Sequence, residues 1–384
     1  MLCFAKVMRR VAFSSRWFFR LFCGALLLVG AAASVTGYYE RWPFWTGEIA
    51  EGSIEPYEVL MLKGSAPRPY VYRHLLPDLA NFVEIVTPAR VQESLYRLVF
   101  PQDKSKGSSK FNLLAEVDER VRRTWFFPCF VLYLLTFASA VLAVIGMYLV
   151  CAAFGLPAPV RTLAPIITIL LAPYFYIYPY DYSELALLMA SSWIALRFDW
   201  WWLLPIAVLG AWNKESYFFF ILLLYPFLRQ RASARHASVA VGALMFLSGL
   251  IYLYMRARFA QNAGTPVEIG LGDRISSFFD HFLLLTATDE VYGLRFFRVS
   301  TLLPTLFLIW AFARVWRRFP GPVRMHGKIG AAINFPLYAL FCSPNEYRNL
   351  SMLSIVFLLM IAFNLQEWLQ RSMPMMTIAA PDNQ

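Results

Sequence analysis

Ten apolar runs dominate the sequence and constrain its fold more than any other feature. They cover residues 19–38, 125–154, 162–180, 183–198, 200–212, 216–228, 237–254, 299–316, 329–342 and 350–368. A helix needs about 20 such residues to cross about 30 Å of hydrocarbon. The runs therefore predict an all-α fold, a polytopic membrane helical bundle of about ten transmembrane helices in one domain (residues 1–384). Four of the runs are short, so the count can differ by one or two.

Composition and charge agree with a membrane protein. Hydrophobic residues make up 59% of the chain and charged residues 15%, with a mean hydropathy of +0.52, whereas soluble domains are about a quarter charged. The net charge of +11 comes from basic residues at the ends of the apolar runs, which encodes orientation and differs from the basic face of a nucleic-acid binder. The five cysteines show no C-x-x-C spacing and the four histidines are scattered. We therefore expect no nucleic-acid partner, disulfide framework, metal or other cofactor.

Basic residues also predict the orientation. Five lie between positions 6 and 20, so the N-terminus is expected in the cytoplasm. Ten alternating spans then bring most other basic residues of the short loops to the same side. The first run carries "GAAAS" at residues 30–34 after a basic start, which also fits a cleavable signal peptide. Either alternative leaves the following segment outside the cytoplasm.

Two long segments are expected as extracytoplasmic loops, residues 39–124 and residues 256–298. The first contains "HLLPDLANFVEIV" at residues 74–86, where apolar and polar positions mix. That pattern suits a helix lying on the membrane surface. The first loop is therefore predicted to be large and to carry interfacial helices.

Five polar stretches interrupt the apolar pattern, and by this topology all fall at the extracytoplasmic ends of spans. They read "GYYERW", "PRPYVYRHLLPDL", "YPYDYSE", "AWNKESYFFF" and "CSPNEYRNLS". Charges at membrane depth are costly and persist mainly when paired or lining a wet cavity. We expect the five stretches to line one polar cavity, although each alone also fits an exposed loop or an interfacial ion pair.

The side chains of these stretches suggest a chemistry. A carboxylate can deprotonate an acceptor hydroxyl, and the candidate catalytic acids are Glu40, Glu55 and Glu58. Arginine and lysine can hold and neutralise a phosphate. The candidate substrate-binding residues are Arg73, His74, Asp181, Glu184, Lys214, Glu215, Glu346 and Arg348. This set suits transfer of a sugar from a lipid-phosphate donor, but it also suits a transporter or flippase of an anionic lipid or glycolipid, or a non-catalytic assembly subunit.

The order of these stretches resembles the GT-C superfamily of membrane glycosyltransferases. Glu40 follows the first span in "GYYERW", and "YRHLLP" follows later in the first long loop. The resemblance implies an inverting transferase of the bacterial inner membrane that takes a polyprenyl-phosphate-linked sugar to an extracytoplasmic acceptor. It implies catalysis by Glu40 and a phosphate contact for Arg73. Because Glu40 stands without a second acid beside it and is followed by Arg41, Glu55 and Glu58 stay rival candidates for the base.

Overall fold

The computed structural model describes residues 2–41, 57–100, 119–175, 178–267, 288–292, 294–297, 302–342 and 347–372. In chain order the elements are α1 (Leu2–Arg41), α2 (Tyr57–Lys63), η1 (Tyr70–Tyr72), α3 (Leu75–Val86), α4 (Ala89–Val99), α5 (Glu119–Ala153), α6 (Ala158–Phe175), α7 (Tyr180–Arg197), η4 (Trp200–Trp202), α8 (Leu203–Asn213), α9 (Tyr217–Leu223), α10 (Tyr225–Leu228), α11 (Ala234–Arg258), β1 (Thr288–Val291), β2 (Leu294–Phe297), α13 (Leu302–Trp316), α14 (Gly321–Phe341), η5 (Tyr347–Leu353) and α15 (Ser354–Ser372). Among these residues, strands occur only in the antiparallel β1–β2 hairpin. The predicted helical class is confirmed.

Each predicted apolar run contains helix in the structure. Five helical segments are long and apolar enough to cross a membrane: Trp17–Tyr39, Arg122–Ala153, Ala158–Phe175, Ala234–Arg258 and Tyr347–Ser372. Two shorter apolar segments, Tyr217–Leu228 and Leu302–Trp316, accompany them. The chain therefore has the helices of a multi-pass membrane protein, while the number of crossings stays a prediction.

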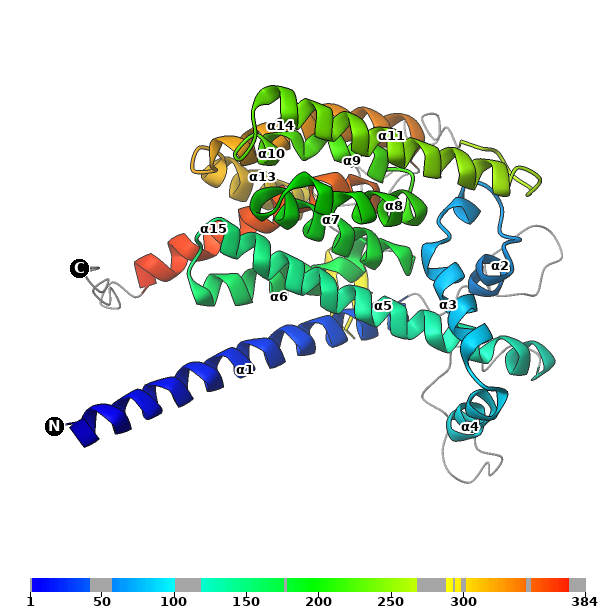
Figure 1. The fold of residues 1–384 in the computed structure, drawn as a ribbon, viewed down its shortest axis with the longest axis horizontal. Coiled ribbons are helices and arrows are strands. Elements are labelled where there is room, and N and C mark those ends of the chain that lie inside the picture. The colour runs from blue at the N-terminus through cyan, green and yellow to red at the C-terminus, as the bar shows by residue number, and fades with distance from the viewer. Residues whose placement is uncertain are drawn as a thin grey trace.

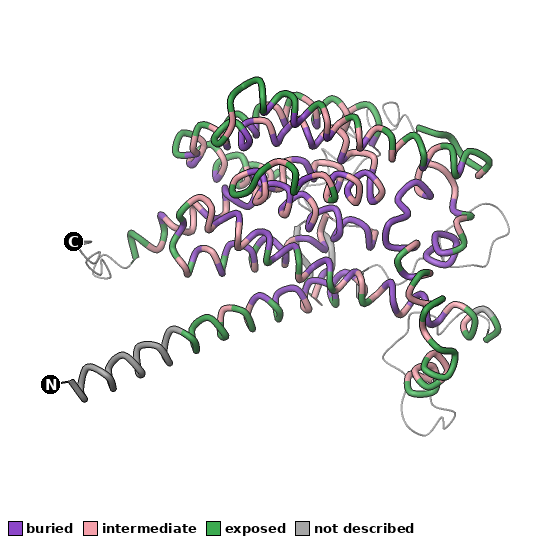
Figure 2. The backbone as a smooth tube through the Cα atoms, viewed as in Figure 1, coloured by how far each residue is buried: buried purple, intermediate pink, exposed green. Residues whose placement is uncertain are grey.

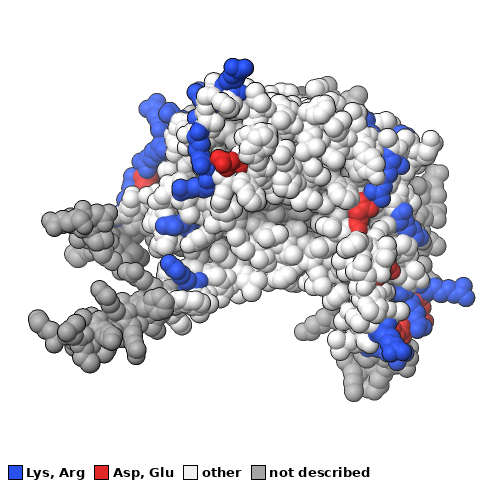
Figure 3. Space-filling view, viewed as in Figure 1, with Lys and Arg blue, Asp and Glu red and all other residues white. Residues whose placement is uncertain are grey.

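The two ends of the bundle differ. The start of α1 and the end of α15 lie at one end of the molecule, and α2, α3 and α4 lie at the opposite end (Figure 1). On the face shown in Figure 3, Lys and Arg side chains gather towards both ends and leave a broad uncharged middle. An apolar middle flanked by basic residues is the surface expected of a bilayer-spanning bundle.

Helix α5 is the central support of the bundle and packs against α7, α6 and α1. Small residues let the helices approach closely, as is usual where helices meet in lipid. A Cβ atom on Gly146 of α5 would lie 2.8 Å from Met189 Cβ of α7. Residues 30–39 of α1 are largely buried, whereas the outer side of α11 is exposed (Figure 2).

The helices are interrupted at two of the polar stretches. Pro179 precedes α7, and Lys214 follows α8 in an extended conformation (φ −162°). The Asn213 side chain bridges α7 and α8, because its amide donates to the Tyr180 carbonyl (3.0 Å) and its oxygen accepts from Ser183 (2.6 Å). These breaks place the polar stretches before α7 and between α8 and α9 beside each other.

The first long loop is attached to the end of α11. Asp78 at the start of α3 accepts two hydrogen bonds from Arg258 (2.7 and 2.9 Å) and one from the Trp212 indole (3.1 Å). Asn262 donates to the carbonyls of Gly64 and Ala66 (2.8 and 3.0 Å). The part from α2 to α3 is therefore held against α8 and α11, whereas α4 contacts α5 and projects from the bundle (Figure 1).

A labelling experiment tests the predicted topology. Single cysteines are introduced into a variant without the native five cysteines, at Lys63, the exposed last residue of α2, and at Arg231, exposed in the turn before α11. On intact cells, an impermeant thiol reagent is expected to label position 63 and to label position 231 only after permeabilisation. Labelling of both positions on intact cells would contradict the orientation derived from the basic residues.

Candidate functional site

A buried ionic cluster forms where α7, the α8–α9 turn and η5 meet. Lys214 Nζ lies 2.6 Å from Glu184 Oε2 and 3.4 Å from Asp181 Oδ1. The other Glu184 oxygen accepts hydrogen bonds from Ser216 (2.8 Å) and Ser351 (2.7 Å). Lys214 is only 2% exposed, and a buried charge is tolerated when its partners complete its hydrogen bonds.

Tyr180 connects this cluster to the first long loop. Its hydroxyl oxygen accepts hydrogen bonds from Nη1 of Arg73 (2.5 Å) and from Nη1 of Arg348 (3.0 Å). Arg73 also donates to both carboxylate oxygens of Glu215 (2.6 and 3.2 Å). Nη1 of Arg348 lies 3.8 Å from Asp181 Oδ1. Four of the five polar stretches therefore meet around one tyrosine, in a buried ionic cluster.

Four tyrosines surround the two arginines. They are Tyr57, Tyr70, Tyr178 and Tyr180, with ring centroids 5.1–5.8 Å apart. The guanidinium carbon of Arg348 lies 4.4 Å from the Tyr178 ring centroid, and that of Arg73 lies 5.1 Å from the Tyr180 ring centroid. Aromatic faces stabilise guanidinium groups, so this tyrosine cage favours charged arginines in a dry environment.

The cluster is neutral as a whole. Among the described residues it contains three cations and three carboxylates: Arg73, Lys214 and Arg348 against Asp181, Glu184 and Glu215. An anionic ligand at this site therefore competes with a carboxylate of the protein. Glu215 is the partner that reaches the surface, because 30% of its side chain is exposed while the other two carboxylates are almost fully covered.

Glu58 lies beside the cage in a different environment. It is 7% exposed, and its Oε2 atom and the Tyr57 hydroxyl, both buried, have no hydrogen-bond partner in the protein. Both residues line a small cavity of about 20 Å³ that Tyr180 also lines, large enough for about one water molecule. Burial raises the pKa of Glu58 to about 8, and a hydrogen bond from its own backbone amide opposes this shift only in part. Of the three candidate bases, Glu58 is the one whose side chain the structure describes, and one of its oxygens is buried without a hydrogen-bond partner.

His74 faces away from the cluster. Its ring lies 4.9 Å from the Phe259 ring, and its Nε2 lies 3.5 Å from Asp78 Oδ1. Burial lowers the pKa of His74 to about 4, and the nearby carboxylate of Asp78 offsets only part of this effect. His74 is therefore neutral at pH 7, and it packs the first loop onto the end of α11 rather than adding a cation.

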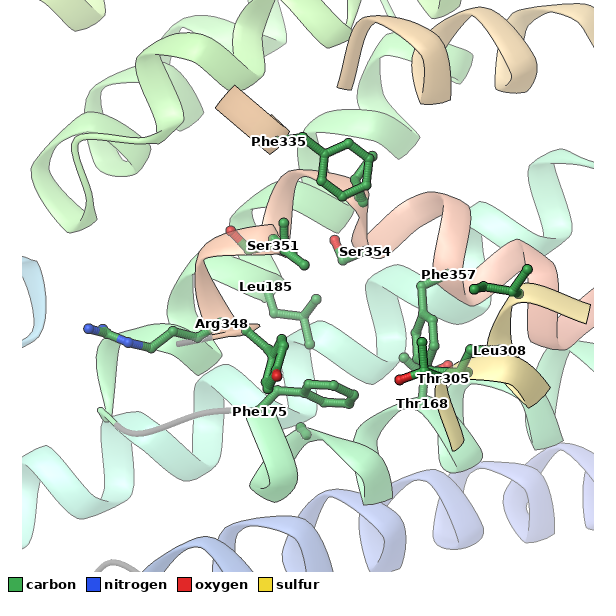
Figure 4. Close-up of a pocket in the computed structure, with 15 residues that line it drawn as sticks. Thr168, Phe175, Leu185, Thr305, Leu308, Phe335, Arg348, Ser351, Ser354 and Phe357 are labelled. Atoms are coloured by element: carbon green, nitrogen blue, oxygen red, sulfur yellow. The ribbon is translucent and has the colours of Figure 1, made fainter. Parts of the chain in front are cut away.

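A larger cavity of about 580 Å³ lies on the other side of Arg348 (Figure 4). Side chains of α6, α7, α13, α14, η5 and α15 line it, and most of them are apolar. Figure 4 shows the Arg348 side chain extending away from the other labelled residues, towards its partners Tyr180 and Asp181. The volume lies in the range of ligand-binding cavities, so this space can hold an apolar chain whose end approaches Arg348.

The structure describes most of the predicted site residues. Arg73, Asp181, Glu184, Lys214, Glu215 and Arg348 come together in the cluster, and Glu58 lies next to it. Glu55, Glu346 and the side chain of Glu40 lie outside the described residues. Among the side chains described, no three of His, Cys, Asp or Glu form a group that could hold a metal ion.

Sequence reasoning missed the central role of Tyr180. It also missed the hydroxyls of Ser216 and Ser351, which hold Glu184. Each of these three residues lies one to three positions from a predicted charged residue. The hydroxyl-bearing neighbours of the charged residues were therefore the sequence feature that could have identified them.

Comparison of the chain with protein-family models, curated proteins and solved structures finds no match. The function is therefore argued from the residues of this chain.

Proposed function

We propose that this protein is a membrane glycosyltransferase that moves a sugar from a polyprenyl-phosphate donor to an extracytoplasmic acceptor. One observation carries the proposal: Arg348, which lines a large apolar cavity, donates a hydrogen bond of 3.0 Å to Tyr180, which lines a small cavity together with Glu58. One buried oxygen of Glu58 has no hydrogen-bond partner. A lipid-linked donor needs an apolar space for its lipid, and the acceptor hydroxyl needs a carboxylate nearby to take its proton.

The large cavity suits the lipid part of the donor. Its lining is mostly apolar, and it ends at Arg348, which is 2% exposed. In this proposal the lipid chain occupies the cavity and its phosphate reaches the cluster beside Arg348. Arginine forms charge-assisted hydrogen bonds with phosphate, and the phosphate replaces a carboxylate in the neutral cluster.

The small cavity has room for about one water molecule, so it can admit the hydroxyl end of the acceptor. In this proposal the acceptor hydroxyl gives its proton to Glu58, and its oxygen forms a bond to the anomeric carbon of the sugar. The bond between that carbon and the phosphate oxygen breaks on the opposite face, which inverts the configuration. The leaving phosphate keeps the bonding electrons, and the arginines neutralise its charge.

We assign the base to Glu58, the one of the three candidate acids whose side chain the structure describes. A general base works best when its pKa lies near the working pH, and burial raises the pKa of Glu58 to about 8. Its Oε2 atom has no hydrogen-bond partner, and the residue lines the small cavity together with Tyr57 and Tyr180.

Replacing Glu58 by glutamine tests this assignment. The variant keeps the side-chain shape and removes the base, so transfer is expected to fall by about 100-fold or more. Sugar transfer from polyprenyl-phosphate sugars is measured in membranes, with the protein amount checked by blotting. Glu84→Gln, in the same loop but half-exposed on α3, is the matched control and is expected to keep activity.

The pH profile gives a second readout of the same test. A base must be deprotonated, so the wild-type rate is expected to rise as the pH increases through about 8. The residual rate of Glu58→Gln is expected to lose this step. Full activity in the variant moves the role to Glu40 or Glu55, and full activity in all three glutamine variants would end the enzyme proposal.

Transport of an anionic lipid is the second candidate, because an apolar cavity ending at Arg348 suits a lipid that is moved as well as one that reacts. Proteoliposomes with a fluorescent lipid phosphate separate the two functions. Lipid movement that survives Glu58→Gln, without any sugar transfer by the wild type, would favour transport.

A further inference from the structure

A second ionic cluster lies far from the proposed site, at the end of the molecule where α15 ends (Figure 1). The carboxylate of Glu367 accepts hydrogen bonds from Arg314 (3.1 Å) and Arg318 (2.6 Å) and also forms an ion pair with Arg371. Only 8% of the Glu367 side chain is exposed. One nearly buried carboxylate thus holds three guanidinium groups together.

The single carboxylate of Glu367 does not balance the positive charge of its three arginine partners. Three arginines against one glutamate give a net charge of +2, and the arginine side chains are 30%, 50% and 70% exposed for Arg314, Arg318 and Arg371. Like charges repel when they are held close, so a further anion beside these guanidinium groups stabilises the cluster. The exposed N–H groups of Arg318 and Arg371 are the ones positioned to bind it.

Aromatic and apolar side chains place the cluster at the surface of the bilayer. Trp310 and Trp368 are 55% and 59% exposed, and the guanidinium carbon of Arg314 lies 5.3 Å from the Trp310 ring centroid. Exposed apolar residues continue along α13: Leu303, Leu306 and Phe307. Tryptophan is enriched where the hydrocarbon meets the headgroups, so the arginines lie at headgroup level beside a lipid-facing helix.

We propose that Arg314, Arg318 and Arg371 form a binding site for the headgroup of an anionic phospholipid. Basic clusters between helices at this depth bind phosphate headgroups. A lipid with two phosphates, such as diphosphatidylglycerol, matches the charge of +2. Its acyl chains lie along the exposed apolar face of α13. The site is independent of the proposed transferase reaction.

Native mass spectrometry of the purified full-length protein tests the site. Wild-type protein is expected to bind diphosphatidylglycerol more tightly than phosphatidylcholine. The double variant Arg318→Gln/Arg371→Gln keeps Arg314 as a partner of Glu367 and removes the two more exposed cations. Its affinity for diphosphatidylglycerol is expected to fall about 30-fold, since each arginine at the surface contributes about fivefold.

The matched control is Arg229→Gln/Arg235→Gln. It removes the same charge from exposed residues around the α10–α11 turn, and it is expected to keep wild-type affinity. Equal losses in both double variants would show attraction by net charge alone and overturn the site. Equal binding of the two lipids by the wild type would overturn it as well.

Discussion

Replacing Lys214 by methionine is expected to destabilise the protein more than any other single change to the polar cluster. Methionine has similar length but no charge, so Asp181 and Glu184 lose their shared cation while both stay buried. Removing one partner of a buried ion pair costs about 3–5 kcal/mol, because the remaining charge is uncompensated. The thermal unfolding midpoint of detergent-purified protein measures this loss.

A second substitution separates charge from packing at this position. Lys214→Met leaves the neutral cluster with one excess negative charge, and adding Glu184→Gln restores neutrality. Glutamine can still accept hydrogen bonds from Ser216 and Ser351, which bind Glu184 in the wild type. The double variant is therefore expected to unfold at a higher temperature than Lys214→Met alone. A single variant that melts like the wild type would show that the pair contributes no stability.

Gly210→Ala is expected to cause the largest packing defect. A Cβ atom at Gly210 of α8 would lie 2.4–2.5 Å from three ring atoms of Tyr217, far inside van der Waals contact. Tyr217 is 2% exposed and its hydroxyl is hydrogen-bonded to Ser191, so the ring has no free space to move into. Overpacking of this kind costs about 1–3 kcal/mol or more, again read from the unfolding midpoint.

Gly242→Ala is the matched control, because a Cβ atom at Gly242 of α11 meets nothing within 4 Å. Alanine there is expected to leave the midpoint unchanged or to raise it slightly, since alanine has the higher helix propensity. Equal effects of the two substitutions would show that the contact with Tyr217 does not limit the packing of α8 against α9.

The cluster also shows how far the pattern of charges was informative. Hydropathy located the polar stretches around Arg73, Lys214 and Arg348, and the alternation of spans put them on one side. These are properties of each segment and its neighbours, so they can be read without knowledge of the packing. Arg73, Lys214 and Arg348 lie together in the cluster. By contrast, His74, from the same stretch as Arg73, packs against Phe259 instead.

The partners of each charge came only from the tertiary structure. The pairing of Lys214 with Glu184 rather than with its neighbour Glu215 depends on how α7 lies against α8. The hydrogen bonds that two arginines donate to the Tyr180 hydroxyl join three distant segments. No local pattern encodes such contacts, because they depend on the distance and angle between helices far apart in the chain.

The sequence alone determined the chemical class of this protein: a helical membrane chain, with basic residues at the ends of its apolar runs and polar side chains in five stretches. The apolar content of the chain decides this, because a protein surrounded by water could not shield all of these apolar segments from it. Only the tertiary structure distinguished residues of similar type. Burial leaves His74 neutral beside Asp78, keeps Arg73 paired with Glu215, and leaves Glu58 with a raised pKa and an unpartnered oxygen. The local dielectric and the available hydrogen-bond partners decide the charge state and the pairing of each side chain, and both depend on how the helices pack.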